Sequence, residues 1–121
     1  MTNSVGHRRE RVAAAIKQHL SAALRTRVKD PRVELTSITR VDVTSDLSHA
    51  TIFVNVLGEA DERAAALEGL ESARGFLRSV LAKVLRIRTL PELHFTYDRG
   101  IEHAARINEI LDQIKKTEDP R

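Results

Sequence analysis

The chain has no cysteine, and aromatic residues make up only 3% of its 121 residues. Without cysteine it has no disulfide framework, no thiolate chemistry and no cysteine-ligated zinc, which suits a reducing cytoplasm. Scarce aromatic rings argue against base stacking as the main means of binding nucleic acid, and they require an aliphatic core. No apolar run approaches the roughly 18 residues of a membrane span. The N-terminus also lacks the apolar stretch of a signal peptide, so a soluble cytoplasmic protein is expected.

Acidic residues are missing from the stretch Ser72–Leu90, which carries five basic side chains. On a helix the apolar residues of this stretch fall on one arc, namely Phe76, Leu77, Val80, Leu81, Val84 and Leu85. Its basic residues lie largely on the other arc. An ordinary solvated face gains stability from Glu–Lys pairs, which an all-positive face gives up. The stretch could be a solubilising surface, but a polyanionic partner, most commonly a phosphate backbone, explains it better.

Charge is unevenly distributed along the chain. Residues 1–32 have a net charge of +6, residues 72–90 have +5, and the remainder has −8, which together give +3. Positive charge is therefore concentrated in two segments. A fold that joined them would have a basic face and an acidic back.

The sequence contains no constellation typical of catalysis or of a cofactor. It has no glycine-rich phosphate loop, no Ser/His/Asp arrangement and no dinucleotide fingerprint. None of its five histidines forms a pair with metal-ligand spacing, so no metal site is predicted. Asp42 and Asp46 flank a short turn, where capping explains them better than catalysis. We expect a binding protein without enzymatic activity and without a cofactor.

Hydrophobic periodicity and turn signals predict an α+β fold with a three-stranded sheet and helices on one face. The expected elements are a helix His7–Val28 ended by Asp30-Pro31, strands Leu35–Val43 and His49–Leu57 in an antiparallel hairpin, a helix capped by Asp61 and running to about Ala73, a kink or short break at Gly75, a basic helix to about Ile87, a strand Glu92–Asp98 and a final helix Ile101–Ile114. The whole chain, residues 1–121, is expected to form a single domain, with residues 1–6 and 115–121 disordered.

Gly75 lies inside a strong helical pattern, where glycine costs about 1 kcal/mol relative to alanine. One interpretation is structural: close helix packing or a C-cap. The other is functional, because a helix that restarts here would expose backbone N–H groups suited to phosphate, and glycine would let a backbone come close. The sequence leaves both interpretations open.

Several motifs together resemble the bacterial ribosome-binding factor A family over most of the chain. The most specific are Asp30-Pro31-Arg32, the hairpin segment Ser45-Asp46-Leu47 followed by Ala50, the run Gly75-Phe76-Leu77-Arg78, and Arg88-x-x-Pro91-Glu92-Leu93-x-Phe95 leading to Tyr97-Asp98. The resemblance implies a KH-like domain of type II topology, in the order α-β-β-α-kink-α-β with a C-terminal helix. KH domains usually clamp nucleic acid with a Gly-x-x-Gly loop, which is absent here. The family's Ala-x-Gly kink, Ala73-Arg74-Gly75, stands in its place.

The resemblance also implies a function: binding to the immature small (30S) ribosomal subunit, assistance in late maturation and 5′-end processing of 16S rRNA, and a role in cold adaptation. It implies a cytoplasmic monomer whose partners are that subunit, its 16S rRNA precursor and an assembly GTPase. The expected RNA-binding residues are Arg74, Gly75, Arg78, Lys83, Arg86 and Arg88, extended by Arg8, Arg9 and Arg11. The alternatives are a generic nucleic-acid-binding module acting outside the ribosome, and a protein-interaction domain whose basic face meets an acidic protein.

Overall fold

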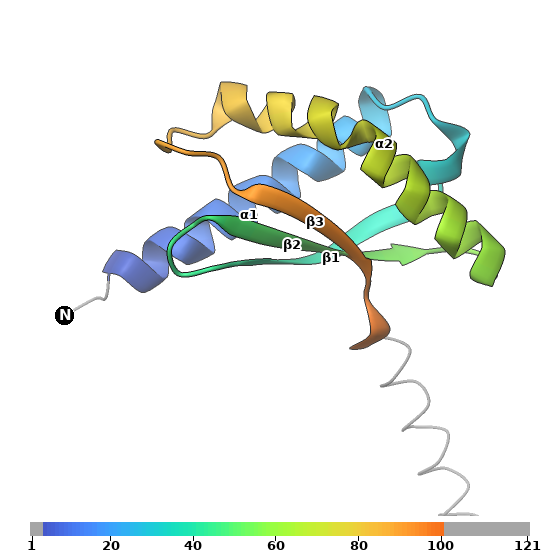
Figure 1. The fold of residues 1–121 in the computed structure, drawn as a ribbon, viewed down its shortest axis with the longest axis horizontal. Coiled ribbons are helices and arrows are strands. Elements are labelled where there is room, and N and C mark those ends of the chain that lie inside the picture. Colours follow the sequence, from blue (N-terminus) through green and yellow to red (C-terminus); the bar gives the residue numbers. More distant parts are fainter. Residues whose placement is uncertain (1–3, 101–121) are drawn as a thin grey trace, which may run out of the picture.

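The computed structural model describes residues 4–100, with side chains from residue 7 onward. Its elements follow the order α1 (Ser4–Thr26), the short 3-10 helix η1 (Pro31–Val33), β1 (Thr36–Val43), β2 (His49–Val56), α2 (Ala60–Val84) and β3 (Glu92–Tyr97) (Figure 1). The final helix predicted at Ile101–Ile114, and residues 115–121, lie outside the described residues. Neither α1 nor α2 is long and apolar enough to cross a membrane.

Helix α1 begins earlier than the periodicity suggested. It includes residues 4–6, which were expected to be disordered, and it ends at Thr26 rather than Val28. The chain then turns through Asp30, whose Oδ1 accepts a hydrogen bond from the backbone N–H of Arg32 at 2.9 Å. Pro31 is the first residue of η1, where its missing N–H costs nothing. The predicted end of the first helix ahead of Asp30-Pro31 is confirmed.

The sheet is mixed, with β2 in the middle. Strands β1 and β2 pair antiparallel, as the hairpin prediction required, and β3 pairs parallel to β2 on its other edge. The β1 register shifts between Ile38 and Arg40, so the inward-facing residues continue at Val41 after a bulge. Parallel pairing of β3 requires a long crossover, which α2 provides.

Helix α2 corrects the prediction around Gly75. The structure has one hydrogen-bonded helix from Ala60 to Val84 with no break, and it ends three residues before Ile87. Figure 1 shows α2 changing direction partway along its length, while the helix itself continues without a break through Gly75. Asp61 does not cap the helix. Glu59 precedes it, and the backbone N–H of Glu59 donates to Glu62 Oε1 at 3.1 Å.

Both helices pack on one face of the sheet, as predicted. The shared aliphatic core includes Ile16 and Leu20 of α1, Ile52 and Val54 of β2, Leu70, Leu77 and Leu81 of α2, and Leu93 of β3. Alternate β2 residues point away from this core, and His49 at the start of the strand is exposed. The sheet therefore has a helix-covered face and an open face.

Candidate nucleic-acid interface

The predicted binding residues of α2 differ in how free their side chains are. Lys83 is exposed near the end of the helix and has no hydrogen bond or ion pair among the described residues. Arg74 is half-buried: its guanidinium donates to the backbone oxygen of Leu93 at 3.4 Å and pairs with Glu71 at 3.3 Å. Arg78 is exposed but donates to the backbone oxygen of Leu90 at 3.3 Å. Arg74 therefore also ties α2 to β3, and Arg78 ties it to the segment that leads into β3.

Gly75 is exposed, and a Cβ added there would meet no atom within 4 Å. Its φ is not positive and it is not at a helix end, so close packing and C-capping are both excluded as reasons for it. The predicted helix N-terminus at this residue does not exist either, because α2 is continuous. What remains is a bare stretch of backbone that a partner could approach closely.

The tightly packed glycine of α2 is Gly69, which the sequence analysis did not single out. It is buried, and a Cβ there would lie 2.9 Å from Val33 Cγ1 and 3.2 Å from Arg32 Cβ. Gly69 lets η1 rest directly on α2. The only signal in the sequence was a glycine inside an Ala- and Leu-rich helical pattern. This signal does not distinguish Gly69 from Gly75, which also lies inside a helical pattern.

The two basic segments of the chain meet at one end of the molecule. Figure 1 shows the start of α1, the turn between β1 and β2, and the loop after α2 gathered at that end. Arg8 of α1 and Arg88 of the loop line the same hollow, of about 380 Å³, together with Ile87, Thr89 and turn residues 46–48. Arg86 is exposed in the same loop, which carries it and Arg88 beyond the end of α2. The charge distribution left open whether the two segments meet, and the structure brings Arg8 and Arg88 to one hollow.

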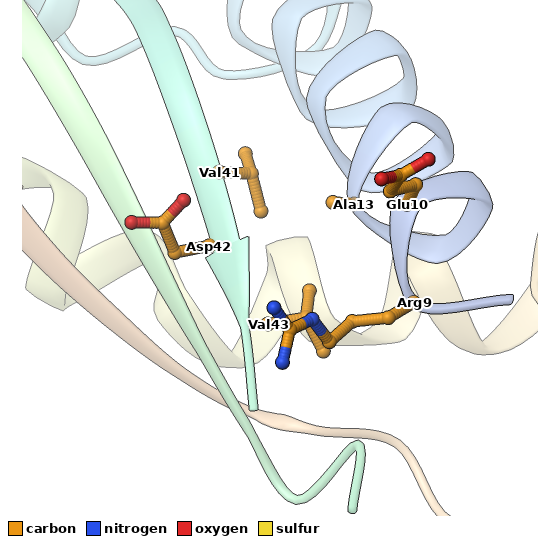
Figure 2. A pocket seen from close by; sticks show the side chains of 6 residues that line it. All are labelled: Arg9, Glu10, Ala13, Val41, Asp42 and Val43. Carbon is orange, nitrogen blue, oxygen red and sulfur yellow. The ribbon is translucent and has the colours of Figure 1, made fainter. Parts of the chain in front are cut away.

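The other two predicted arginines of α1, Arg9 and Arg11, lie outside the hollow that Arg8 and Arg88 share. Arg9 reaches across from the first turns of α1 toward Val43 at the end of β1 (Figure 2) and lines a second hollow of about 400 Å³ with Glu10 and Asp42. Two carboxylates beside Arg9 make this hollow less suited to phosphate than the one at Arg8. Arg11 is exposed and does not line the hollow that Arg8 and Arg88 share.

One cation that sequence reasoning missed adjoins Gly75. The guanidinium of Arg27, near the end of α1, stacks over the ring of Phe76 with 5.2 Å to its centroid. Phe76 was assigned to the apolar arc, yet 39% of it is exposed. The surplus of basic residues after Leu24 was visible in the sequence, but their proximity to α2 depends on how the two helices pack. Arg27 extends the basic surface from α2 to the residue that follows α1.

The turn that borders the Arg8 hollow is held by Asp46. Its Oδ1 accepts hydrogen bonds from Ser48 Oγ at 2.7 Å, Thr44 Oγ1 at 2.8 Å and the Ser48 backbone N–H at 3.1 Å. These bonds, the Ser48 side chain first, lower the pKa of Asp46 to about 2. Leu47 takes a positive φ of 62° inside this turn. Asp46 is therefore the turn cap that the sequence suggested, and it holds the hollow's rim in place.

The arrangement suits a polyanion rather than a small substrate. Exposed cations lie along the outer side of α2, on the loop after it and at the start of α1. No buried polar or charged side chain occurs among the described residues, so nothing there resembles an enclosed catalytic centre. The site is an open basic surface, and phosphate groups spaced along a strand fit it well.

Comparison with known proteins also shows similarity to ribosome-binding factors. The family described as Ribosome-binding factor A matches residues 8–111. A relative of that name from Natranaerobius thermophilus is 43% identical over 114 residues, which cover 94% of this chain and 87% of the relative. The crystal structure of ribosome-binding factor A from Thermus thermophilus superposes with a TM-score of 0.68 at 28% identity, covering 75% of this chain and 96% of that one.

A second structural match is a homology model of the Thermus thermophilus ribosome binding factor A, fitted into the cryo-EM map of a 30S complex of that protein. It superposes with a TM-score of 0.60 at 30% identity, over 72% of this chain and 91% of that one.

Proposed function

The chain belongs to the ribosome-binding factor A family, whose members are ribosome assembly factors and not enzymes, and on this premise we propose that it binds the immature 30S subunit through 16S rRNA. The relative fitted into a 30S map supports this partner. Binding serves late maturation of the subunit and processing of the 5′ end of its rRNA by nucleases. The protein acts as a cytoplasmic monomer, and an assembly GTPase promotes its release.

The proposed binding domain is a KH-like fold of type II topology that extends over the whole chain. The order of elements, two helices on one face of a mixed sheet, and the structural matches support it. The usual clamp loop between two helices is absent, because α2 runs unbroken through Gly75. RNA would therefore lie along the side of α2 instead of inside a loop, with the backbone at Gly75 open to a close phosphate.

The observation that carries the proposal is the hollow shared by Arg8 and Arg88. Residues 80 positions apart in the sequence bring two positive charges to one hollow, where the carboxylate of Asp46 offsets only one of them. A phosphate bound there would neutralise the remaining positive charge. Binding then favours one rRNA arrangement over its competitors by differential affinity, which needs no catalytic group.

A charge reversal with a matched control tests the interface. Arg88→Glu should weaken binding to immature 30S particles by about tenfold and reduce the slope of affinity against salt by about one unit, because one phosphate contact is lost. Arg99→Glu is the control, since Arg99 is also exposed but follows the far end of β3. Equal loss in both variants would indicate a nonspecific charge effect, and no loss in Arg88→Glu would refute the assignment of this hollow.

A depletion strain tests the function itself. Cells lacking the protein should accumulate free subunits and 16S rRNA with extra 5′ nucleotides, measured by gradient sedimentation and primer extension. The defect should deepen in the cold, where misfolded RNA helices escape more slowly. Mature 5′ ends at low temperature, with a normal gradient, would instead favour a generic RNA-binding role. Proteins that stay bound to this chain after RNase treatment would favour a protein-interaction domain.

A further inference from the structure

Three metal-ligand side chains converge on the open face of the sheet, next to the turn that borders the Arg8 hollow. They are His49 at the start of β2, and Glu92 and His94 of β3, and all three are exposed. One donor atom from each lies within 4.8 Å of the others. The ring nitrogens His49 Nδ1 and His94 Nε2 are 3.0 Å apart.

The parallel pairing of β2 and β3 creates this convergence. His49 is the register partner of Glu92, and His94 follows two residues later on the same face of β3. The neighbours Ala50 and Leu93 point the other way and are fully buried, which fixes the direction of each strand's side chains. The backbone N–H of Glu92 donates to the Ser48 oxygen at 2.9 Å, so the two strand ends are held together at the cluster.

The spacing of the two imidazole nitrogens matches that of two ligands on one ion. Zinc–nitrogen bonds are about 2.0–2.1 Å long, so neighbouring nitrogen ligands at angles of about 90–110° lie about 2.8–3.4 Å apart. The observed 3.0 Å falls inside that range. A set of two imidazoles and a carboxylate suits Zn²⁺ and its neighbours in the transition series, whereas Mg²⁺ and Ca²⁺ prefer oxygen alone.

A hydrogen bond between the two rings is the competing explanation, since one neutral imidazole can donate to another. It would account for the His49–His94 distance but not for Glu92. The Glu92 carboxylate has no hydrogen bond or ion pair in the described part of the chain, yet it stands beside both rings. A cation uses all three groups and offsets the carboxylate's charge.

We propose that His49, Glu92 and His94 bind one Zn²⁺ ion on the open sheet face. Their side chains would supply three ligands, and water would fill the remaining position, because the cluster is exposed. Binding requires the ring protons to sit on His49 Nε2 and His94 Nδ1, which leaves the facing nitrogens free to coordinate. The ion would pin the edge strand β3 to β2 and so raise the melting temperature when Zn²⁺ is present.

The test is calorimetric titration of the full chain with ZnCl₂ after removal of metal by a chelator. We expect saturable binding at one ion per chain and a higher melting temperature. His94→Ala should abolish both effects. Glu92→Gln keeps both rings and their mutual hydrogen bond, yet it should weaken binding by about tenfold or more, since even outer-shell partners are worth about 10–100-fold.

His19→Ala is the matched control, because His19 lies on α1 outside the cluster and should leave binding unchanged. Circular dichroism of each variant without metal reports whether it folds. If His94→Ala fails to fold, the nitrogen-15 shifts of the imidazoles in the unaltered chain decide, since coordination moves Nδ1 of His49 and Nε2 of His94 specifically. Absence of saturable binding, equal binding in Glu92→Gln, or shifts confined to other histidines would overturn the proposal.

Discussion

Gly69 lies directly against Val33: a Cβ at Gly69 would be 2.9 Å from Val33 Cγ1, which belongs to a buried side chain. We predict that Gly69→Ala lowers the free energy of unfolding by about 1–2 kcal/mol, because overpacking exceeds the gain in helix propensity. Urea denaturation measures it.

Gly75→Ala in the same helix is the counterpart, and it should raise the free energy of unfolding by about 0.5–1 kcal/mol, since added atoms meet open space. If the Gly75 backbone contacts rRNA phosphate, this more stable variant should bind 30S particles more weakly. A Gly75→Ala variant that is both stabilised and fully active would show that the glycine has no role in binding.

The β1–β2 turn should carry an acid-sensitive part of the stability. The folded-state pKa of Asp46 is about 2, below its ordinary value of 3.8. The unfolded chain therefore takes up this proton more readily, so the contribution is complete above about pH 4 and is lost as pH falls toward 2. Asp46→Asn should be less stable than the parent at pH 6, and the difference should shrink between pH 4 and pH 2. A difference that is constant with pH in urea titrations would contradict this.

Arg74 should anchor β3 as well as face RNA. Replacing it with Met keeps the aliphatic stem but removes the hydrogen bond to the Leu93 oxygen, which at this half-exposed position should cost about 1 kcal/mol or less. Amide exchange in β3 should accelerate more than elsewhere in the sheet. Lys83→Met, on the same helix but with an unpartnered side chain among the described residues, should leave β3 exchange unchanged.

Arg8 and Arg88 should act together in binding if one phosphate sits between them. Arg8→Ala and Arg88→Ala would each weaken binding to 30S particles, and the double variant would weaken it by less than the sum. The expected coupling is about 0.5–1.5 kcal/mol in a double-mutant cycle. Strict additivity would mean that the two side chains contact separate groups.

Local patterns were enough to predict the hairpin, because alternation in β2 and a capped turn at Asp46 are encoded within a few residues. They were enough to predict that α2 ends in a basic segment. They were not enough to interpret Gly75 and Gly69, since each glycine's role depends on what the tertiary fold brings against it. Only η1, which is distant from α2 in the sequence, distinguishes the two.

The histidines show the same limit more sharply. Ligand-spacing rules detect metal-ligating residues that share one element, and His49 and His94 are 45 positions apart. Their convergence depends on β3 joining β2 in parallel with one particular register, which no periodicity reports. Charge alone suggested that the two basic segments would form one face if the fold joined them. It gave no sign that Arg74 and Arg78 would also donate hydrogen bonds to backbone oxygens.

The position of β3 has a consequence for how the molecule assembles. The β1–β2 hairpin closes over a short turn, whereas β3 can pair with β2 only after the residues of α2 have been made and folded across the sheet. Because chains emerge from their N-terminus, β2 passes through a period as an unprotected edge with Ile52, Val54 and Val56 in a row along one side. A chain cut before Glu92 would keep that edge permanently, and we expect it to self-associate where the full chain stays dispersed.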